Sequence, residues 1–200
     1  MSEIEFNERP RIFLVRAGST DLDDQDRIVG ALDMPLSPEG EREARSIALD
    51  LKESGIVAIF SAAGLASQQT ARQLSRSGEI RVRVEENFVN LNYGLWHGKS
   101  RSELKENQPR LYRQWQENPD SICPPDGEPI EAARDRVRVV LKKILRKHKT
   151  GVLAIVAPDP LLSILRSELE GTEVRDLLDL RCEENAWCDV DWVPSSVLKS

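Results

Sequence analysis

The chain alternates between short apolar runs and longer segments of mixed polarity. Three runs, "RIFLVR" (11–16), "GIVAIFS" (55–61) and "GVLAIVA" (151–157), are almost continuously apolar and rich in β-branched residues. This pattern predicts strands that are buried on both faces of a sheet. "EIRVRVEE" (79–86) and "NAWCDVDWV" (185–193) alternate between apolar and polar residues. These two segments are predicted to be strands with one solvated face, the last one at a sheet edge.

Segments with helical periodicity lie between the predicted strands. In 36–54, Ser37 is suited to cap a helix, Pro38 suits the first helical position, and apolar residues recur at helical spacing. The other predicted helices are 65–77, 101–119 in two pieces broken at Pro109, 128–149, 160–171 ended by Gly171, and a short one at 173–178. The segments 87–100 and 121–129 are predicted to be loops.

Alternating strands and helices predict an α/β fold with three layers, α/β/α, around a mostly parallel central sheet. We expect one domain over residues 11–193, preceded by an N-terminal extension (1–10) and followed by a C-terminal tail (194–200). Ligands of such folds bind beyond the carboxyl ends of the strands. The candidate site is therefore expected in the loops that follow residues 16, 61, 86 and 157.

The composition is that of an ordinary soluble protein, with 40% hydrophobic and 31% charged residues among 200. No run approaches the ~18 apolar residues of a membrane span, and the acidic start "MSEIEFNERP" is unlike a secretory signal. We therefore expect a cytoplasmic protein that does not bind membranes. The net charge of −6 argues against a nucleic-acid partner. Cys123, Cys182 and Cys188 have no CxxC spacing, which favours free thiols over a zinc site or disulfides.

Five motifs then occur in order along the chain. They are Arg16-Ala17-Gly18 after the first strand, "GALDMPLSPEG" (30–40), Gln69-Thr70-Ala71, "GLWHG" (94–98) and "PDGE" (125–128). Together they resemble the histidine phosphatase superfamily, also called phosphoglycerate mutase-like, over about residues 11 to 193. The resemblance implies the phosphoglycerate mutase-like form of the α/β/α fold.

The resemblance also implies where the reactive side chains of the family would stand. In that family a histidine attacks phosphorus, two arginines and a second histidine hold the phosphoryl oxygens, and an acid protonates the leaving group. Carried over, the nucleophile falls on Ala17, the second arginine on Ala66, the acid on Asn90 and the second histidine on Pro158, with Ala157 as another alignment. The first arginine is retained as Arg16, and Asp159 stands where the family has glycine.

These replacements remove the chemistry that the family uses. Alanine offers no nucleophile and asparagine cannot act as a general acid. The first hypothesis is therefore a catalytically inactive protein, a pseudo-enzyme with a binding or regulatory role. The alternative is a phosphoester hydrolase or phosphoglycerate mutase-like enzyme with a non-standard site, using Arg16, His97 and a metal. A third hypothesis is a structural subunit that keeps only the scaffold.

Several residues remain as binding candidates. Arg16, Ser19 and Thr20 are expected to bind a small anion or phosphorylated ligand together with the backbone N–H groups around Gly18. Arg16 could instead pair with a nearby acid such as Asp159. The expected rim of the pocket consists of Tyr93, Trp96, His97 and Asp159.

Two further features have a simpler interpretation. The acidic segment "STDLDDQD" (19–26) lacks the spacing of a calcium loop; we expect a solvated loop, no metal and no cofactor, although this segment could present charge to a protein partner. His148 follows a long predicted helix, where a structural role near the negative end of the helix dipole is favoured.

Overall fold

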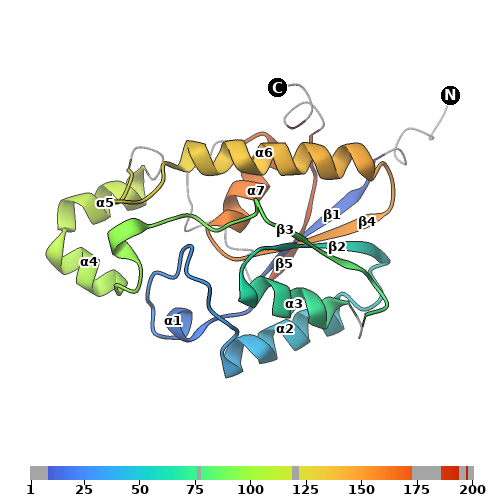
Figure 1. Ribbon diagram of the computed structural model, residues 1–200, viewed down its shortest axis with the longest axis horizontal. Helices are drawn as coiled ribbons and strands as arrows, with labels where there is room; N and C mark the ends of the chain where they lie inside the picture. Colours follow the sequence, from blue (N-terminus) through green and yellow to red (C-terminus); the bar gives the residue numbers. More distant parts are fainter. Residues whose placement is uncertain (1–8, 76–77, 119–121, 173–185, 194–196, 198–200) are drawn as a thin grey trace.

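The fold is described from a computed structural model of the chain, for residues 9–75, 78–118, 122–172, 186–193 and 197. A five-stranded sheet forms its centre, with the strand order β3-β2-β4-β1-β5 (Figure 1). The strands are β1 (Arg11–Arg16), β2 (Ile56–Ala62), β3 (Val82–Glu85), β4 (Val152–Ala157) and β5 (Trp187–Val190).

The sheet is mostly parallel, as the sequence predicts. β4 lies between β1 and β2 and is parallel to both, and β3 continues the parallel order beyond β2. β5 is antiparallel to β1 and forms one edge of the sheet. The continuous apolar runs thus occupy the three central strands, where both faces are covered, and the two alternating segments occupy the edges.

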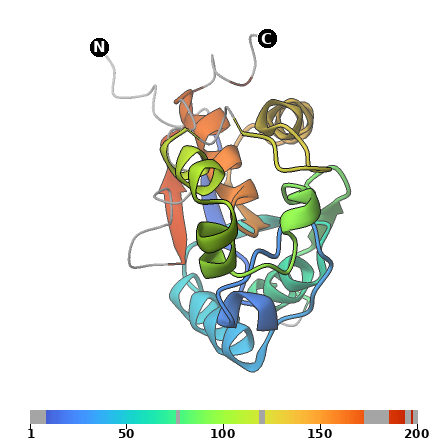
Figure 2. The same ribbon diagram turned by 90° about the vertical axis from the view of Figure 1, so that its left-hand side faces the viewer.

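Helices cover both faces of the sheet (Figures 1 and 2). α2 (Pro38–Asp50) and α3 (Leu65–Leu74) lie on one face, and α6 (Ile130–Lys147) and α7 (Leu161–Glu170) lie on the other. α4 (Arg101–Asn107) and α5 (Pro109–Glu117) lie at one end of the molecule. Pro109 separates these two helices, as predicted.

Alternate residues of the central strands build the two cores. On β1, Phe13 and Val15 pack with Ile47 of α2, whereas Ile12 and Leu14 belong to the larger core with α6 and α7. Successive side chains of a strand point to opposite faces. The same run therefore supplies both cores, which explains why it shows no polar alternation.

Helix ends agree with their local signals. Ser37 accepts a hydrogen bond from the Gly40 N–H at the start of α2, and Gly171 ends α7 in the left-handed conformation (φ 70°). Gly171 suits this position because it has no Cβ to clash. The predicted helix at 173–178 and Cys182 lie outside the described residues, as do most residues of the N-terminal extension and tail.

Some short helical segments were not predicted, including a 3-10 turn at Gly94–Trp96 within the predicted loop 87–100. α1 (Asp21–Asp24) forms within the acidic segment, where we expected a solvated loop. Thr20 accepts a hydrogen bond from the Asp23 N–H, and the Asp23 carboxylate accepts one in return from the Thr20 N–H. This reciprocal cap, with three acidic residues in the first turn, stabilises the helix because carboxylates are favourable near a helix N-terminus.

Candidate functional site

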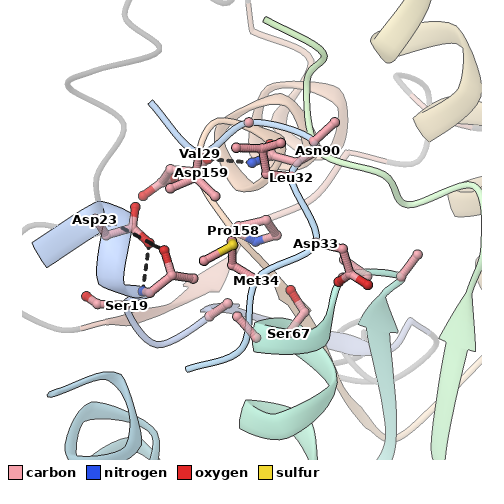
Figure 3. Close-up of a pocket in the computed structure, with 18 of the residues that line it drawn as sticks. Ser19, Asp23, Val29, Leu32, Asp33, Met34, Ser67, Asn90, Pro158 and Asp159 are labelled. Atoms are coloured by element: carbon pink, nitrogen blue, oxygen red, sulfur yellow. Dashed lines mark hydrogen bonds between the residues drawn. The ribbon is translucent and has the colours of Figure 1, made fainter. Parts of the chain in front are cut away.

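A pocket of about 260 Å³ opens at the carboxyl ends of β1, β2 and β4, where the sequence places the site. Its lining comes from 16–20, Asp23, 29–34, 62–64, 66–67, 89–90 and 158–159. In the close-up, Pro158 and Met34 lie between Asp23 on one side and Asp33 on the other (Figure 3). A second cavity adjoins it and shares Arg16, Asp23 and Asp159.

The structure brings most of the candidate residues to this pocket. Those that line it are Arg16, Ala17, Ser19, Thr20, Ala66, Asn90, Pro158 and Asp159. Tyr93 lines the adjoining cavity, while Trp96 and His97 line neither cavity. The four positions that the resemblance assigns to chemistry are thus neighbours, and none of their side chains is a nucleophile or an acid.

The backbone donors of the loop after β1 are all used within the protein. Ala17 N–H donates to the Ala157 carbonyl (2.9 Å) and Gly18 N–H to Thr70 Oγ1 (3.0 Å). Ser19 N–H donates to Glu43 Oε2 (2.8 Å) and Thr20 N–H to Asp23 Oδ2 (2.8 Å). An anion arriving at this loop would have to displace two carboxylates to reach a backbone donor.

Glu43 reaches the loop because two glycines let α2 approach it. A Cβ on Gly40 would lie 2.0 Å from the Ser19 carbonyl oxygen, and one on Gly18 would lie 2.3 Å from the Gly40 carbonyl oxygen. Such distances are excluded for any larger residue, so the two backbones pack closely. The Glu43 carboxylate, one turn along α2 from Gly40, then also accepts from the Ser19 hydroxyl (2.9 Å).

Arg16 shares the same acid. Its guanidinium lies 3.7 Å from Glu43 Oε1, with the side chain 36% exposed. The sequence suggested an acid such as Asp159 as a partner, and the structure shows Glu43 in this role, because α2 packs against the end of β1. The pairing is half-solvated and long, so its contribution to stability is small.

Asn90 has a structural role at the position that the resemblance assigns to the acid. Its Nδ2 donates to the Asp159 carbonyl (2.9 Å), and its Oδ1 accepts from the Leu91 N–H (2.9 Å) and the Leu161 N–H (3.1 Å). The side chain is 6% exposed. It therefore ties the loop after β3 to the first turn of α7 and satisfies a helix N–H that needs an acceptor.

His97 stabilises a segment that lines the pocket without lining the pocket itself. Its Nε2 accepts hydrogen bonds from the N–H groups of Ala31 and Tyr93, both at 3.2 Å. Burial lowers the pKa of His97, and a hydrogen bond with the Gly94 backbone raises it by less. The neutral ring thus joins a pocket-lining segment to the loop at 91–97.

Tyr93 and Trp96 serve mainly in packing. Burial raises the pKa of the Tyr93 phenol, with nearby Arg101 lowering it and Asp159 raising it, so this hydroxyl stays protonated. Trp96 is 1% exposed and packs edge-on against Trp115. These side chains form the aromatic part of the core beneath the adjoining cavity.

The charges around the pocket favour cations over anions. Asp23, Asp33 and Asp159 line it against the single cation Arg16. Asp33 Oδ1 accepts from the Leu65 N–H (2.7 Å), so a carboxylate already occupies the N-terminus of α3. Most of the remaining lining is apolar. Ser67, 1% exposed, has a buried hydroxyl with no hydrogen-bond partner in the structure.

Within the described part of the chain, no group of three or more His, Cys, Asp or Glu side chains is arranged to hold a metal ion. Cys123 is an exposed free thiol. Among the described helices, none is both long and apolar enough to cross a membrane.

Residues 12–197 match the family described as the histidine phosphatase superfamily, branch 1. The chain belongs to the histidine phosphatase superfamily. Phosphoserine phosphatase 1 of Hydrogenobacter thermophilus is 22% identical over 177 residues, covering 88% of this chain and 84% of that protein. A bifunctional protein of Mycobacterium tuberculosis is 30% identical over 162 residues, and the match spans 80% of this chain and 44% of that protein.

Several solved structures share the fold. The structure named mycobacterial hydrolase 2 superimposes with a TM-score of 0.82 at 24% identity, over 96% of this chain and 86% of that one. A mycobacterial glucosyl-3-phosphoglycerate phosphatase gives a TM-score of 0.75 at 23% identity, over 84% and 82% of the two chains. At this identity the likeness establishes the fold.

Sequence reasoning missed Glu43, Asp33 and Ser67 as parts of the site. Glu43 lies on the polar side of an ordinary amphipathic helix, and only the packing of α2 brings it to Ser19. Asp33 lies in a quoted motif and Ser67 follows one of the substituted positions, so their places in the motifs were the available signal.

Proposed function

We propose that this member of the histidine phosphatase superfamily is a ligand-binding protein that does not carry out phosphoryl transfer. The observation that supports this most directly is the loop after β1. Ala17 stands at the position implied for the nucleophile, and the N–H groups of residues 17–20 are donated to internal acceptors. Catalysis of phosphoryl transfer depends on donors and cations aimed at the phosphoryl oxygens.

The pocket lining suggests the ligand class. A phosphate monoester carries a charge of about −1.5 to −2 at neutral pH, and here it would meet Asp23, Asp33 and Asp159 with only Arg16 to attract it. An apolar molecule with a protonated amine suits these surroundings better, because the carboxylates attract it and the apolar walls bury its body. This departs from the small anion expected from the sequence.

The first test titrates the protein with two matched probes, benzylamine and benzyl phosphate. Binding of each probe is monitored by the NMR signals of the protein. We expect benzylamine to shift amide signals of the pocket segments 29–34 and 62–67, and benzyl phosphate to bind at least ten-fold more weakly. Tighter binding of benzyl phosphate, or no binding of either probe in the pocket, would overturn the proposed ligand class.

A second candidate function, hydrolysis of phosphoesters, is favoured by the names of the relatives and by one contact in the site. The Ser19 hydroxyl donates to Glu43 Oε2 (2.9 Å), and Arg16 lies beside the same carboxylate. This arrangement resembles a nucleophile, its base and a cation. In this candidate, Ser19 Oγ attacks phosphorus, its proton passes to Glu43, and the bond from phosphorus to the leaving oxygen breaks. Glu43 then returns the proton to the leaving oxygen, and water attacks the phosphoserine to release phosphate and restore the Ser19 hydroxyl.

Hydrolysis of para-nitrophenyl phosphate decides between the two functions. We expect no turnover above background by the purified protein, with or without divalent metal. Turnover that is lost in Ser19→Ala and in Arg16→Ala would instead establish the hydrolase. Activity that is equal in the protein and both variants would come from a contaminant, and the non-catalytic proposal would stand.

A further inference from the structure

A third cavity, separate from the pocket and from the cavity that adjoins it, lies beside the edge strand β3. It is lined by Phe60 of β2, by Arg81, Arg83 and Glu85 at β3, and by Lys143, Lys147 and His148 at the C-terminal end of α6. None of these residues lines the pocket at the carboxyl ends of the strands. The cavity is therefore a separate site from the pocket of the proposed function.

The cavity gathers positive charge in a protein whose net charge is −6. Four cations line it against one carboxylate, Glu85, which Lys143 Nζ approaches to 3.1 Å. Among the described residues, no carboxylate lies within ion-pair distance of Arg81 or Lys147. The C-terminus of α6 contributes a partial negative charge of only about half an electron, which leaves the cavity clearly positive.

The excess of positive charge affects the protonation of His148. Its Nε2 lies 2.6 Å from Arg83 Nη1. An arginine is always protonated and can only donate, so Nε2 accepts and the ring is neutral. Burial lowers the pKa of His148, and the nearby charges of Arg83 and Lys147 lower it further. The Arg83 guanidinium thus donates to a neutral imidazole, although no carboxylate among the described residues lies within ion-pair distance of Arg83.

Aromatic contacts hold the Arg83 and His148 side chains in place. The Arg83 guanidinium lies 5.6 Å from the Phe60 ring centroid, and the His148 ring packs edge-on against the same ring at 5.4 Å. Phe60 is 2% exposed and belongs to the core. A guanidinium held over a rigid ring loses little freedom on binding, so this arrangement differs from a solvated basic surface with mobile side chains.

From this geometry we propose that the cavity between β3 and the end of α6 is a binding site for a small multiply charged anion of the phosphate type. Arg81, Arg83 and Lys147 would hold the anion, and His148 would become protonated beside it. The guanidinium groups suit phosphate because their planar fork donates two parallel hydrogen bonds to its oxygens. Glu85 and Lys143 pair with each other at the margin.

The test titrates inorganic phosphate into the protein and follows the NMR signals of the histidine rings. The chain has two histidines, so His97 serves as an internal control. We expect phosphate to shift the His148 signals saturably and to raise the pKa of His148, while the His97 signals stay in place. Sodium chloride at matched ionic strength should give a much smaller shift. A response to phosphate that chloride reproduces would overturn the proposal.

Substitutions inside and outside the cavity distinguish a defined phosphate site from a general effect of surface charge. Arg81→Gln combined with Lys147→Gln should weaken phosphate binding at least ten-fold, while Arg146→Gln, an exposed cation on the same helix that does not line the cavity, should leave it within two-fold. Equal weakening of phosphate binding in the double variant and in Arg146→Gln would contradict a defined site in the cavity. Arg16→Ala should retain the full His148 response, which keeps this result separate from the pocket at the strand ends.

Discussion

Glu43 accepts hydrogen bonds from both the backbone N–H and the hydroxyl of Ser19, at 2.8 and 2.9 Å. A residue of α2 thereby places a negative charge in the loop after β1, where the resemblance implies a bound phosphoryl group. Arg16, the one retained cation, lies beside the same carboxylate. The Glu43 carboxylate thus occupies the place of an external anion in this loop. This arrangement differs from the bound phosphoryl group that the family motifs imply.

Removing Glu43 should therefore open the loop to external anions. We expect Glu43→Ala to bind inorganic phosphate at least ten-fold more tightly than the unmodified protein, because Ser19 and Arg16 lose their internal acceptor. A phosphate titration followed by the NMR signals of the amides at 17–20 measures the change separately from binding at the cavity beside β3. Glu41→Ala is the matched control, since Glu41 lies on the same helix and pairs with exposed Arg45. Unchanged phosphate affinity in Glu43→Ala would show that Asp23 and Asp159 alone exclude the anion.

Asn90→Ala should destabilise the fold without any ligand present. The variant leaves the N–H groups of Leu91 and Leu161 without their acceptor, and we expect a loss of about 2–3 kcal/mol in the free energy of unfolding. Urea denaturation provides the measurement. Exposed Asn87→Ala should stay within about 0.5 kcal/mol. A comparable loss in both variants would mean that the Asn90 contacts contribute nothing specific.

His97 should make stability depend on pH. Burial lowers its pKa in the folded state below the ordinary value of 6.5, so the unfolded chain binds the proton more readily. Its contribution is then complete above pH 6.5 and declines as the pH falls below 6.5 toward the lower folded-state pKa. His148, whose pKa is also lowered, acts in the same direction.

We expect His97→Gln to show a shallower loss of stability between pH 7 and pH 5, measured by denaturation at each pH. The amides of Ala31 and Tyr93 should also exchange hydrogen faster in this variant, because both donate to His97 Nε2. His148→Gln is the control that should leave these two amides protected. An unchanged pH dependence in His97→Gln would refute this role for His97.

Glu168 joins α6 to α7 through two arginines. Its carboxylate, 3% exposed, lies 2.7 Å from Arg134 Nε and 2.6 Å from Arg138 Nε. Glu168→Gln should cost about 3 kcal/mol of unfolding free energy, because two partly buried cations lose their shared partner. The exposed pair partner Glu131 offers the control Glu131→Gln, expected to cost less than about 1 kcal/mol. Similar losses in thermal denaturation would contradict a special role for Glu168.

Much of the fold could be predicted from the sequence. The continuous apolar runs at β1, β2 and β4 identified the central strands, and the alternating segments identified both edges. These signals are local, because the side-chain periods of strands and helices are set by backbone geometry within a few residues. The family motifs likewise indicated most of the candidate residues that line the pocket, although Trp96 and His97, expected at its rim, line neither cavity. The short helix α1 was missed because its signal, a threonine followed three residues later by an aspartate, lay among acidic residues typical of a loop.

The tertiary structure alone decided what the site residues contact. Ser19 and Glu43 are 24 positions apart, and their contact depends on the close approach of Gly18 and Gly40. Arg83 and His148 are 65 positions apart, and only the packing of α6 beside β3 brings them together. Sequence patterns record which face a residue occupies, whereas pairing between elements depends on how the helices pack on the sheet. For that reason the sequence by itself determined the layers and the residues at the motif positions. Packing decided that Glu43 occupies the loop after β1 and that the cavity beside β3 is basic.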